Sequence, residues 1–446
     1  MPLPTFAVVL LLAATTAAQT TTGAKTSTGP AKKTTTEKSK TMNWKAVHQA
    51  AIVVDTHADT PGRFVDDNFD PSTGAGRGHW DLAKAKQGNL GVEFFSIWVD
   101  PEKFKGQYVQ RAMRMIDSVY ETVGKHPDQM VMAYSVKDIR AARTGPKKRI
   151  ASLMGLEGGH VIEGDMTLLR DFYRLGVRYM TLTWANSTDW AQSSGDYKKD
   201  PASGKVLDPG LTEYGRKIVM EMNRIGMIVD ISHVSDRSFY NALTASRAPV
   251  IASHSSARAI TDVPRNMTDD MLIALSRNNG VAMVNFNCGF ISDDYNKASK
   301  KYMQDHPDEL KKFRDMQQQY KEGKISENEF QQLEAQLEAQ VPRPPLSALI
   351  DHIDHMVKVA GAEHVGIGSD FDGVPCLPQG IDSVGDLPKI TEALAQRGYT
   401  AKQLNMILGE NLLRVFADVE KTAKQIQSES NADKRSVVPI PPAPKQ

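Results

Sequence analysis

Eight short runs of apolar and β-branched residues recur along the chain, and each is followed by polar residues and a helical pattern. Such a run is typical of a buried strand, and its alternation with helices is typical of successive βα units. Eight parallel strands joined by helices close into a barrel whose functional groups lie at the carboxyl ends of the strands. The sequence therefore predicts an α/β fold, a (β/α)8 TIM barrel. The predicted strands are residues 51–54, 91–99, 150–156, 178–183, 227–232, 249–253, 280–286 and 364–369.

The rhythm is interrupted between the seventh and eighth predicted strands. Residues 296–341 are rich in Lys, Glu and Gln, with apolar residues at helical spacing. We predict a helical insertion of two helices joined at Gly323, with a stop at the proline-rich residues 342–345. An insertion on this face of a barrel can serve as a lid or a dimer contact, and a plain solvated hairpin is an equal alternative.

Both ends of the chain differ in composition from the middle. Residues 1–19 carry no charged side chain and contain an apolar run that closes with small residues, so we predict a signal peptide. A membrane anchor is the alternative, although the run is shorter than the roughly 20 residues that span a bilayer. Residues 20–41 are predicted as a disordered Thr/Lys-rich linker and residues 421–446 as a disordered Pro-rich tail. The barrel is then expected to cover residues 42–420.

The overall charge excludes one class of partner. Lys and Arg number 54 against 53 Asp and Glu, for a formal net charge of +1. Both predicted tails are basic, so the barrel between them is acidic. Such a chain offers no electrostatic footprint for phosphate backbones, and we expect no nucleic-acid partner.

The chain contains two cysteines, Cys288 and Cys376, which excludes a Cys-rich metal site. They follow the seventh and eighth predicted strands, so a barrel would bring them to adjacent loops. We expect two free buried thiols, with a disulfide as the alternative in an oxidising compartment.

Histidines and carboxylates follow the predicted strands, where a barrel assembles its site. His57 and Asp59 are spaced i and i+2, which places two side chains on one face of an extended segment. Imidazole and carboxylate ligands suit zinc, and five ligands are too many for one tetrahedral site that must keep a water. Two ions that share a carboxylate fit this number, so we predict a binuclear zinc hydrolase. The other candidates are Glu157, His233, His254 and Asp370.

These motifs resemble those of the membrane dipeptidase family, also called renal dipeptidases, within the amidohydrolase superfamily. The resemblance runs from about residue 50 to residue 416. It implies a zinc-dependent barrel that hydrolyses dipeptides with a free C-terminal carboxylate and also accepts a D-residue at that end. The motifs that carry it are residues 55–59, 155–160, 232–235, 253–258, 265–267 and 366–373.

The resemblance also implies ligand roles. His57 and Asp59 would bind one zinc ion, His233 and His254 the other, and Glu157 would bridge the two. Two such ions lower the pKa of a bridging water, so that a metal-bridged hydroxide exists at neutral pH.

Two further residues receive catalytic roles from the resemblance. Asp370 would act as general acid and base during attack on the peptide bond. Arg265 would pair its planar guanidinium with the substrate carboxylate, and a surface salt bridge is the alternative for this residue.

The chain departs from the family pattern at two positions expected to contact substrate. Trp184 stands where the family usually has a His that donates a hydrogen bond to the substrate or the developing oxyanion. The single indole N–H of a tryptophan cannot replace that donor from the same place. Asn287 stands where an aromatic residue is common, so substrate preference is expected to differ.

Two other functions stay open from the sequence. One is a metal-dependent hydrolase of another amide or ester, such as N-acyl amino acids, and the other is a catalytically weak binding homologue, suggested by Trp184. For the leading hypothesis we expect a secreted or periplasmic enzyme that acts on small dipeptides without stable membrane insertion after signal cleavage, with a homodimer as one option.

Overall fold

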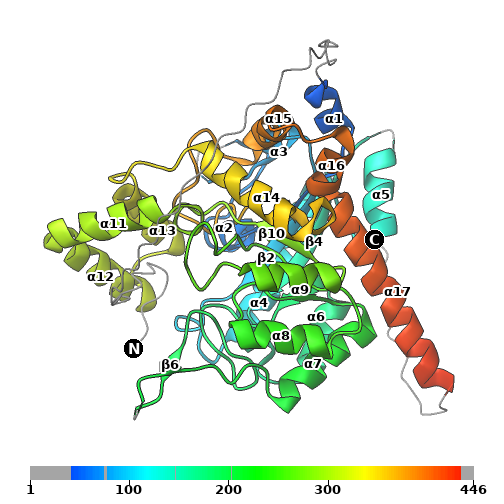
Figure 1. The fold of residues 1–446 in the computed structure, drawn as a ribbon, viewed down its shortest axis with the longest axis horizontal. Helices are drawn as coiled ribbons and strands as arrows, with labels where there is room; N and C mark the ends of the chain where they lie inside the picture. Colours follow the sequence, from blue (N-terminus) through cyan, green and yellow to red (C-terminus); the bar gives the residue numbers. More distant parts are fainter. Residues whose placement is uncertain (1–41, 75–77, 146, 202, 433–446) are drawn as a thin grey trace, which may run out of the picture.

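The computed structural model (Figure 1) describes residues 42–432, apart from residues 75–77, 146 and 202. The signal peptide and linker predicted at residues 1–19 and 20–41 lie outside the described residues, as do residues 433–446. Among the described residues, no helix combines the length and apolar character needed to cross a membrane.

Within the described part of the chain, eight parallel strands follow one another around a nearly closed barrel, in the order of the sequence. Each overlaps a strand predicted from the apolar runs, although the first shares only Val53 and Val54 with its prediction, and the predicted fold class is confirmed. The barrel closes where Asp59 N donates to Phe371 O at 2.8 Å and Asp370 N donates to His57 O at 3.1 Å. The eight strands are β1 (Val53–Ala58), β2 (Leu90–Trp98), β4 (Ile150–Glu157), β5 (Val177–Thr181), β8 (Ile228–Asp230), β9 (Ile251–Ala252), β10 (Val281–Val284) and β11 (Val365–Ile367).

Three short strands lie outside this ring and were not predicted. β3 (Met130–Met132) pairs in parallel with the first three residues of β4, before the part of β4 that pairs with β5. β6 (Lys198–Lys199) and β7 (Val206–Leu207) form an antiparallel hairpin whose side chains are exposed. The hairpin has no apolar face to bury, and therefore lacks the pattern by which a core strand is recognised.

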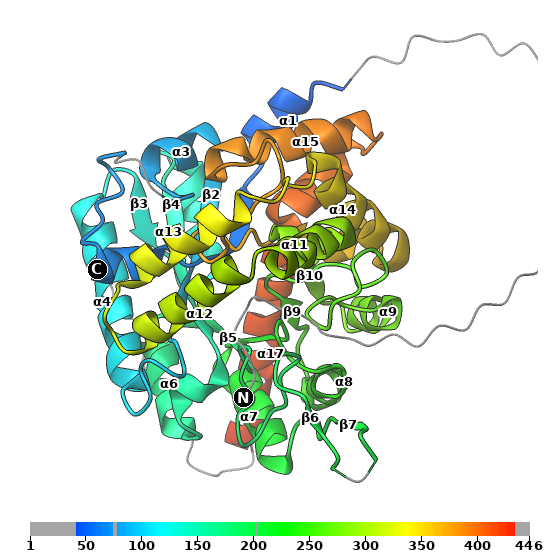
Figure 2. The same cartoon turned by 90° about the vertical axis from the view of Figure 1, so that its left-hand side faces the viewer.

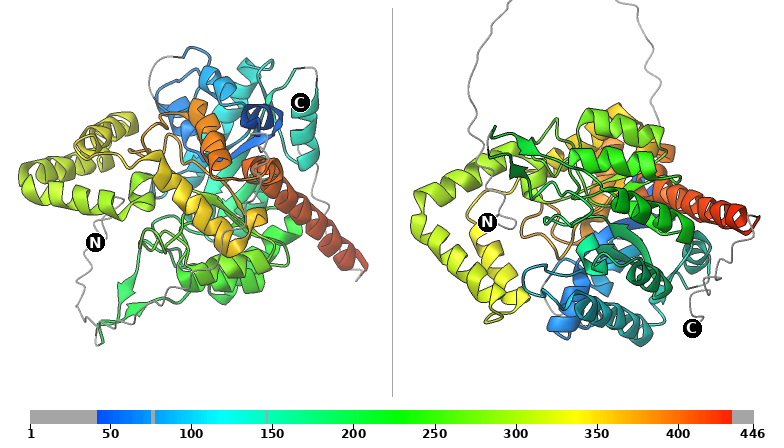
Figure 3. Two further views of the ribbon diagram at one scale, coloured as in Figure 1. Left: turned by 45° about the horizontal axis from the view of Figure 1, so that its top comes forward. Right: turned by 90° about the horizontal axis from the view of Figure 1, so that it is seen from below.

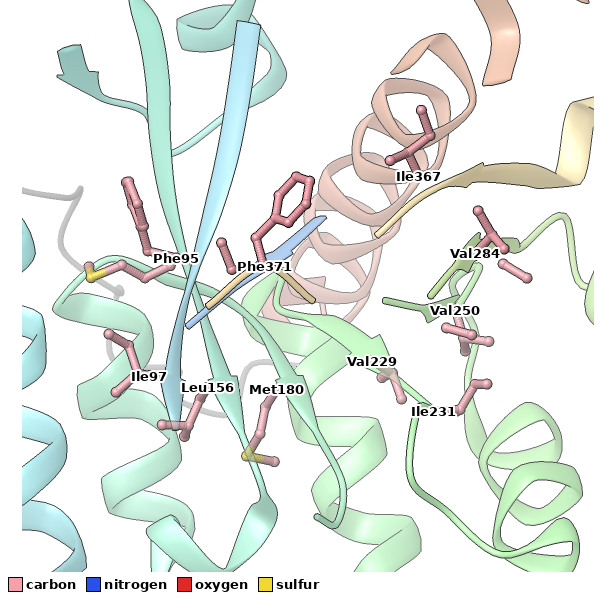
Figure 4. Packing of buried hydrophobic residues seen from close by; sticks show 14 of the residues in the cluster. Phe95, Ile97, Leu156, Met180, Val229, Ile231, Val250, Val284, Ile367 and Phe371 are labelled. Carbon is pink, nitrogen blue, oxygen red and sulfur yellow. The ribbon is translucent and has the colours of Figure 1, made fainter. Parts of the chain in front are cut away.

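Buried side chains of the barrel strands pack against the surrounding helices in one large cluster (Figure 4). Every residue of β4 is buried, which explains why this strand reads as a nearly continuous apolar run rather than an alternating one. The core residues labelled in Figure 4 are Phe95, Ile97, Leu156, Met180, Val229, Ile231, Val250, Val284, Ile367 and Phe371.

Helices surround the strands, and polar residues at strand exits cap several of them. Ser235, two residues after His233, accepts a hydrogen bond from Ser238 N and starts α8. The helices outside the insertion are α1 (Trp44–Ala50), α2 (Thr60–Asp66), α3 (Leu82–Gln87), α4 (Tyr108–Lys125), α5 (Val136–Thr144), α6 (Met166–Arg174), α7 (Glu213–Ile225), α8 (Asp236–Ala245), α9 (Asp269–Arg277), α14 (Leu346–Ala360), α15 (Leu387–Gln396), α16 (Ala401–Asn405) and α17 (Asn411–Ala432). Short helical turns are η1 (Gly159–Ile162), η2 (Ala362–His364), η3 (Val384–Asp386) and the π-type η4 (Met406–Glu410).

The insertion between β10 and β11 is helical, as predicted, but the prediction of two helices was wrong. After the single turn α10 (Cys288–Ile291) it forms α11 (Asp293–Asp305), α12 (Pro307–Lys321) and α13 (Glu327–Glu338). Pro307 begins α12, because proline has no N–H to continue α11 but fits the first turn of a helix. The predicted turn at Gly323 lies between α12 and α13 and has a positive φ of 69°. Figure 2 shows α12 and α13 lying across one end of the barrel.

The prediction of a disordered tail from residue 421 was wrong for residues 421–432, which continue helix α17. Ala423 is buried, and Gln427 Nε2 donates to Arg224 O at 2.8 Å. Arg247 and Glu429 form an ion pair at 2.8 Å. These contacts with α7 and the loop after α8 hold a segment whose composition resembles a solvated tail. In Figure 3, α17 extends beyond the barrel on the side away from the insertion.

Cys288 and Cys376 form a disulfide, so the prediction of two free thiols was wrong. Their Cα atoms are 5.4 Å apart, and Cys288 N donates to Cys376 O at 3.1 Å. The bond joins the start of the insertion to the loop after β11, two segments that only the closed barrel brings together.

Replacing both cysteines with serine should destabilise the protein by about 4–5 kcal/mol, because the bridge closes a loop across 88 residues of sequence separation. Urea unfolding under non-reducing conditions measures this change. Wild-type protein treated with a reductant is the control and should lose the same amount. Equal midpoints for oxidised, reduced and variant proteins would show that the bridge does not stabilise the fold.

Candidate metal centre

The six strand-end residues predicted from the sequence come together at the carboxyl end of the barrel. His57 is the second-last residue of β1, and Asp59 lies between β1 and the first residue of α2. Glu157 ends β4, while His233, His254 and Asp370 follow β8, β9 and β11. Parallel strands place their carboxyl ends on one face, which explains why residues far apart in sequence converge.

Glu157 lies at the middle of the cluster and offers one oxygen to each side. Its Oε2 atom is 3.1 Å from His57 Nε2. Its Oε1 atom is 3.0 Å from His233 Nε2 and 3.5 Å from His254 Nε2. Asp59 Oδ2 lies 3.6 Å from His57 Nε2, on the first side. The cluster thus has two halves that share one carboxylate.

The donor set fits metal ions. His57, Glu157 and His254 can present ligand atoms within 4.8 Å of one another, and so can His57, Asp59 and Asp370. Asp59 Oδ1 is buried and has no hydrogen-bond partner among the described residues. Imidazole nitrogens and carboxylate oxygens that point toward one another, with too few protons for hydrogen bonds among them all, form a site that suits a metal cation.

The ring of His57 is oriented by a tyrosine that sequence reasoning missed. The Tyr179 hydroxyl lies 2.8 Å from His57 Nδ1 and donates its own proton to Thr56 O at 3.0 Å. The hydroxyl must therefore accept from His57 Nδ1–H, which directs Nε2 toward Glu157 and Asp59. Such outer partners fix the tautomer of a ligand histidine.

A second chain of hydrogen bonds orients His254. Its Nδ1 atom lies 2.7 Å from Ser253 Oγ, which donates to Asp230 Oδ2 at 2.6 Å. Asp230 also accepts from the backbone N–H groups of Ser232 and Ser253, at 3.1 and 2.8 Å. Sequence reasoning also missed Asp230, and the only feature that could have indicated it was a single charged residue in the otherwise apolar strand β8.

Electrostatics favour neutral imidazoles at the second half of the cluster. Burial, with help from the charge of Arg265, lowers the pKa of His233 to about 4. Burial likewise places the pKa of His254 well below its ordinary value, with His57 and Arg265 adding to the effect. Neutral imidazole is the form that ligates a metal, so both rings are ready at neutral pH.

Two of the cluster residues have a left-handed backbone. The φ angles are 66° at His233 and 67° at Asp370. This conformation is unfavourable for residues other than glycine and is held here by neighbours, such as the Ser194 N–H bond to His233 O at 2.8 Å. It turns each side chain back over the barrel mouth.

Asp370 is held by Asn285, whose Nδ2 donates to Asp370 Oδ2 at 2.8 Å. Burial raises the pKa of Asp370 to about 7; the charge of His57 opposes this shift, whereas Asp59 and Glu157 add to it. A carboxyl group whose pKa lies near neutral pH suits proton transfer in both directions. A bound cation would lower this pKa.

Arg265 is no surface salt bridge. Its Nη1 donates to Ser255 Oγ at 2.7 Å and its Nη2 to His254 O at 2.8 Å. Its guanidinium carbon lies 5.6 Å from the centre of the Phe290 ring. The Nε atom is buried and has no partner among the described residues, so the guanidinium keeps a free donor. This arrangement suits a carboxylate ligand.

A cavity of about 640 Å³ lies over the cluster, a volume typical of small-molecule sites. Asp59, Glu157, His233 and Asp370 line its floor, and Trp184 and Asn287 line it as well. The Trp184 ring centre is 5.2 Å from that of Trp98 and 6.3 Å from that of His233. Asn287 also caps α10 by accepting from Gly289 N at 2.8 Å.

Helices α12 and α13 form the outer wall of this cavity, so the insertion is a lid rather than a separate solvated hairpin. Lys321 pairs with Glu102 in the loop after β2. Lys103 Nζ lies 3.9 Å from the centre of the Tyr320 ring, and Gln331 Nε2 donates to Asp372 O at 3.2 Å. The lid therefore rests on the loops after β2 and β11.

Comparison with known proteins agrees with this geometry. A family model described as "Membrane dipeptidase (Peptidase family M19)" matches residues 42–430. Dipeptidase 3 of Rattus norvegicus is 33% identical over 354 residues, which cover 79% of this chain and 61% of that protein. The chain thus spans about three fifths of the length of this relative.

Solved structures share the fold. The probable dipeptidase PvdM from Pseudomonas aeruginosa superimposes with a TM-score of 0.70 at 24% identity, covering 85% of this chain and 98% of that one. A metallopeptidase from Rhodobacter sphaeroides, solved with a phosphinate mimic of the dipeptide L-Ala-D-Ala, superimposes with a TM-score of 0.65 at 24% identity. That match covers 83% of this chain and 99% of the other.

Proposed function

The chain belongs to the membrane dipeptidase family, and on that premise we propose that it is an exported, binuclear zinc dipeptidase. The observation that carries the proposal is Glu157, whose two oxygens each face a different half of the histidine and carboxylate cluster. Its substrates are dipeptides with a free C-terminal carboxylate, with a D-residue accepted at that end. The L-Ala-D-Ala mimic bound to a protein of the same fold supports this substrate class.

His57 and Asp59 would hold one zinc ion and His233 and His254 the other, with Glu157 between them. Two zinc ions in this site would lower the pKa of a shared water and polarise the scissile carbonyl. Tyr179 keeps the His57 ring in the tautomer that ligates. Helices α12 and α13 wall the cavity in which the substrate would lie.

Asp370 and Arg265 would act on the substrate. Asp370 can take a proton as the peptide carbonyl is attacked and return it to the leaving amine. The free Nε donor of Arg265, with the spare protons of its Nη atoms, would bind the terminal carboxylate. This fixed distance between carboxylate and scissile bond selects dipeptides.

Export is supported by two features of the chain. Residues 1–19 have the composition of a signal peptide. The disulfide between Cys288 and Cys376 is of the kind that persists in oxidising compartments, such as the periplasm or the extracellular space.

The proposal is tested by metal analysis together with a dipeptide panel. Purified protein should contain two zinc ions per chain and hydrolyse L,L- and L,D-dipeptides, while N-acetylated dipeptide amides, which lack the carboxylate, should not be cleaved. Removal of metal by a chelator should abolish hydrolysis, and added zinc should restore it. Protein with a full metal complement that cleaves no dipeptide in the panel would contradict the proposal.

Trp184 favours one second candidate, a catalytically weak homologue that binds the same ligands. The residue lines the cavity beside His233 and cannot donate as the histidine expected from the family would. Loss of one oxyanion donor typically lowers kcat by on the order of 10² to 10³.

Trp184→His should therefore raise kcat, by roughly 10²-fold if the new imidazole reaches the developing oxyanion. Steady-state kinetics with one good dipeptide substrate measure the change. Trp98→His is the matched control, because Trp98 packs against Trp184 in the same wall and should give no gain. An unchanged kcat in Trp184→His would remove the basis for the weak homologue.

A further inference from the structure

A second cavity of about 230 Å³ adjoins the cavity over the metal centre. We call it the side pocket. It lies between the end of α13 and the loop after β11, and Cys376 of the disulfide forms part of its wall. The residues that line both cavities are His79, Ala335, Ala339 and Pro375.

Glu338, near the end of α13, lines the side pocket and has no counter-charge. The residue is only 8% exposed, and its Oε2 atom is buried without a hydrogen-bond partner among the described residues. Burial alone raises the pKa of its carboxyl to about 7. Folded proteins seldom leave a buried carboxyl unsatisfied, because its desolvation is costly. An unpaired acid facing a cavity is therefore suited to a ligand.

The other charged groups around the side pocket do not neutralise Glu338. Arg343 donates from Nε to Leu377 O at 2.6 Å and from Nη1 to Asp382 Oδ1 at 2.7 Å. Its Nη2 donates to Pro378 O and Ile381 O, both at 2.7 Å. The guanidinium is thus directed at the loop after β11, and Asp382 is paired with it.

His79 is neutral at neutral pH, because burial lowers the pKa of its imidazole. Its Nδ1 accepts from Asp372 N at 2.9 Å, so its proton lies on Nε2. The ring therefore brings no positive charge to the side pocket.

The position of the side pocket relates it to one end of the substrate. His79 is bonded to Asp372, which lies two residues after Asp370, so the pocket begins close to the proposed proton-transfer group. Arg265, the proposed partner of the C-terminal carboxylate, lies in the loop after β9, and β9 is separated from β11 by one strand of the barrel. A dipeptide held by Arg265 would direct its first residue away from β9, toward the side pocket.

We propose that Glu338 and the side pocket form a specificity subsite for the basic side chain of a lysine or arginine at the amino-terminal position of the substrate. This inference rests on the proposed dipeptidase function. A long aliphatic stem fits between Ala335, Ala339 and Pro375, and the cationic end forms a charge-assisted hydrogen bond with the carboxylate.

The kinetic test compares Lys-Ala with norleucyl-Ala, which keeps the stem and lacks the charge. The wild-type enzyme should prefer Lys-Ala in kcat/KM by roughly 10- to 100-fold at pH 8, mostly through KM. Glu338→Gln should bring this ratio close to one, because the amide keeps the size of the side chain and loses its charge. Glu309→Gln, in the exposed part of α12, is the matched control and should keep the preference.

Binding provides a readout that does not depend on turnover. Calorimetry with n-pentylammonium, and with 1-pentanol as its neutral counterpart, should show binding of the cation to wild type and to Glu309→Gln, and loss of binding in Glu338→Gln. If no dipeptide is cleaved but the cation binds through Glu338, the proposed function fails and the subsite stands. Suppose instead that neutral dipeptides are cleaved, that pentylammonium binds no better than pentanol, and that Lys-Ala is not preferred over norleucyl-Ala. The subsite is then overturned and the dipeptidase stands. A preference confined to Ala-Lys would overturn the assignment to the first residue.

The thermal stability of Glu338→Gln at different pH values shows that the variant folds and also tests the buried carboxyl. A buried carboxyl with a raised pKa resists ionisation in the folded state, so it costs stability as pH rises from its unfolded pKa toward 7. The variant should have a higher Tm than wild type at pH 8, and the gain should shrink toward pH 5. The preference for Lys-Ala should grow over the same range as Glu338 ionises. A flat pH dependence of that preference would count against Glu338 as the binding group.

Discussion

Replacing Glu157 with glutamine should lower kcat/KM by at least about 10³-fold and reduce bound zinc below two ions per chain. Glu157 presents one oxygen to His57 and the other to His233, so the amide would leave one half of the cluster without an anionic ligand. Loss of the metal-assisted pathway costs several kcal/mol, and each 1.36 kcal/mol is a factor of ten in rate. Metal analysis and dipeptide kinetics on the same preparation measure both effects.

The control for this variant is Glu121→Gln on the outer surface of α4, where the side chain is 63% exposed. It should retain full metal content and full activity. Circular dichroism and Tm establish that Glu157→Gln is folded before its activity is compared. A folded variant with two zinc ions and a rate within tenfold of wild type would show that Glu157 does not bridge the ions.

Replacing Asp370 with asparagine should lower kcat by roughly 10²- to 10⁴-fold while zinc content stays at the wild-type level, because general acid and base catalysis contributes about that much. Asn285 holds the carboxylate through its Nδ2 group, and an asparagine at residue 370 can keep that contact through its carbonyl oxygen. Kinetics at saturating substrate, with metal analysis, separate a catalytic loss from loss of ligands.

The pH–rate profile provides the sharper readout for Asp370. In wild type, the rate should fall on the acid side as Asp370 takes up a proton and can no longer act as base. This acid limb should disappear in Asp370→Asn, whereas Asp117→Asn on the surface of α4 should keep it. An unchanged acid limb in Asp370→Asn would assign proton transfer to another group.

The barrel could be predicted from the sequence because its signal is local. Each strand is buried and reads as a short apolar run, and the period of the pattern changes where a helix begins. The turn at Gly323 was visible for the same reason, whereas the break at Pro307 was overlooked and the two-helix prediction failed. The end of α17 was misjudged because its stabilising contacts, such as Arg247 with Glu429, are distant in sequence.

The candidate metal ligands could be predicted from the sequence for a related reason. A residue that directly follows a strand lies at the carboxyl face of a barrel, so His57, Glu157 and His254 could be nominated without knowing any distance. The groups that orient them could not. Tyr179 and Asp230 lie within strands, and their role depends on which strand is the neighbour and on which face each side chain points.

Residue types and their neighbours along the chain were enough to predict the strand order, the candidate ligands and the departure at Trp184. Three features follow only from the folded chain: the bond between Cys288 and Cys376, the insertion as a wall of the cavity over the metal centre, and the unpartnered Glu338 at the side pocket. Each of these depends on closure of the barrel, which brings together loops that are many residues apart, and no local pattern records which side chains then meet.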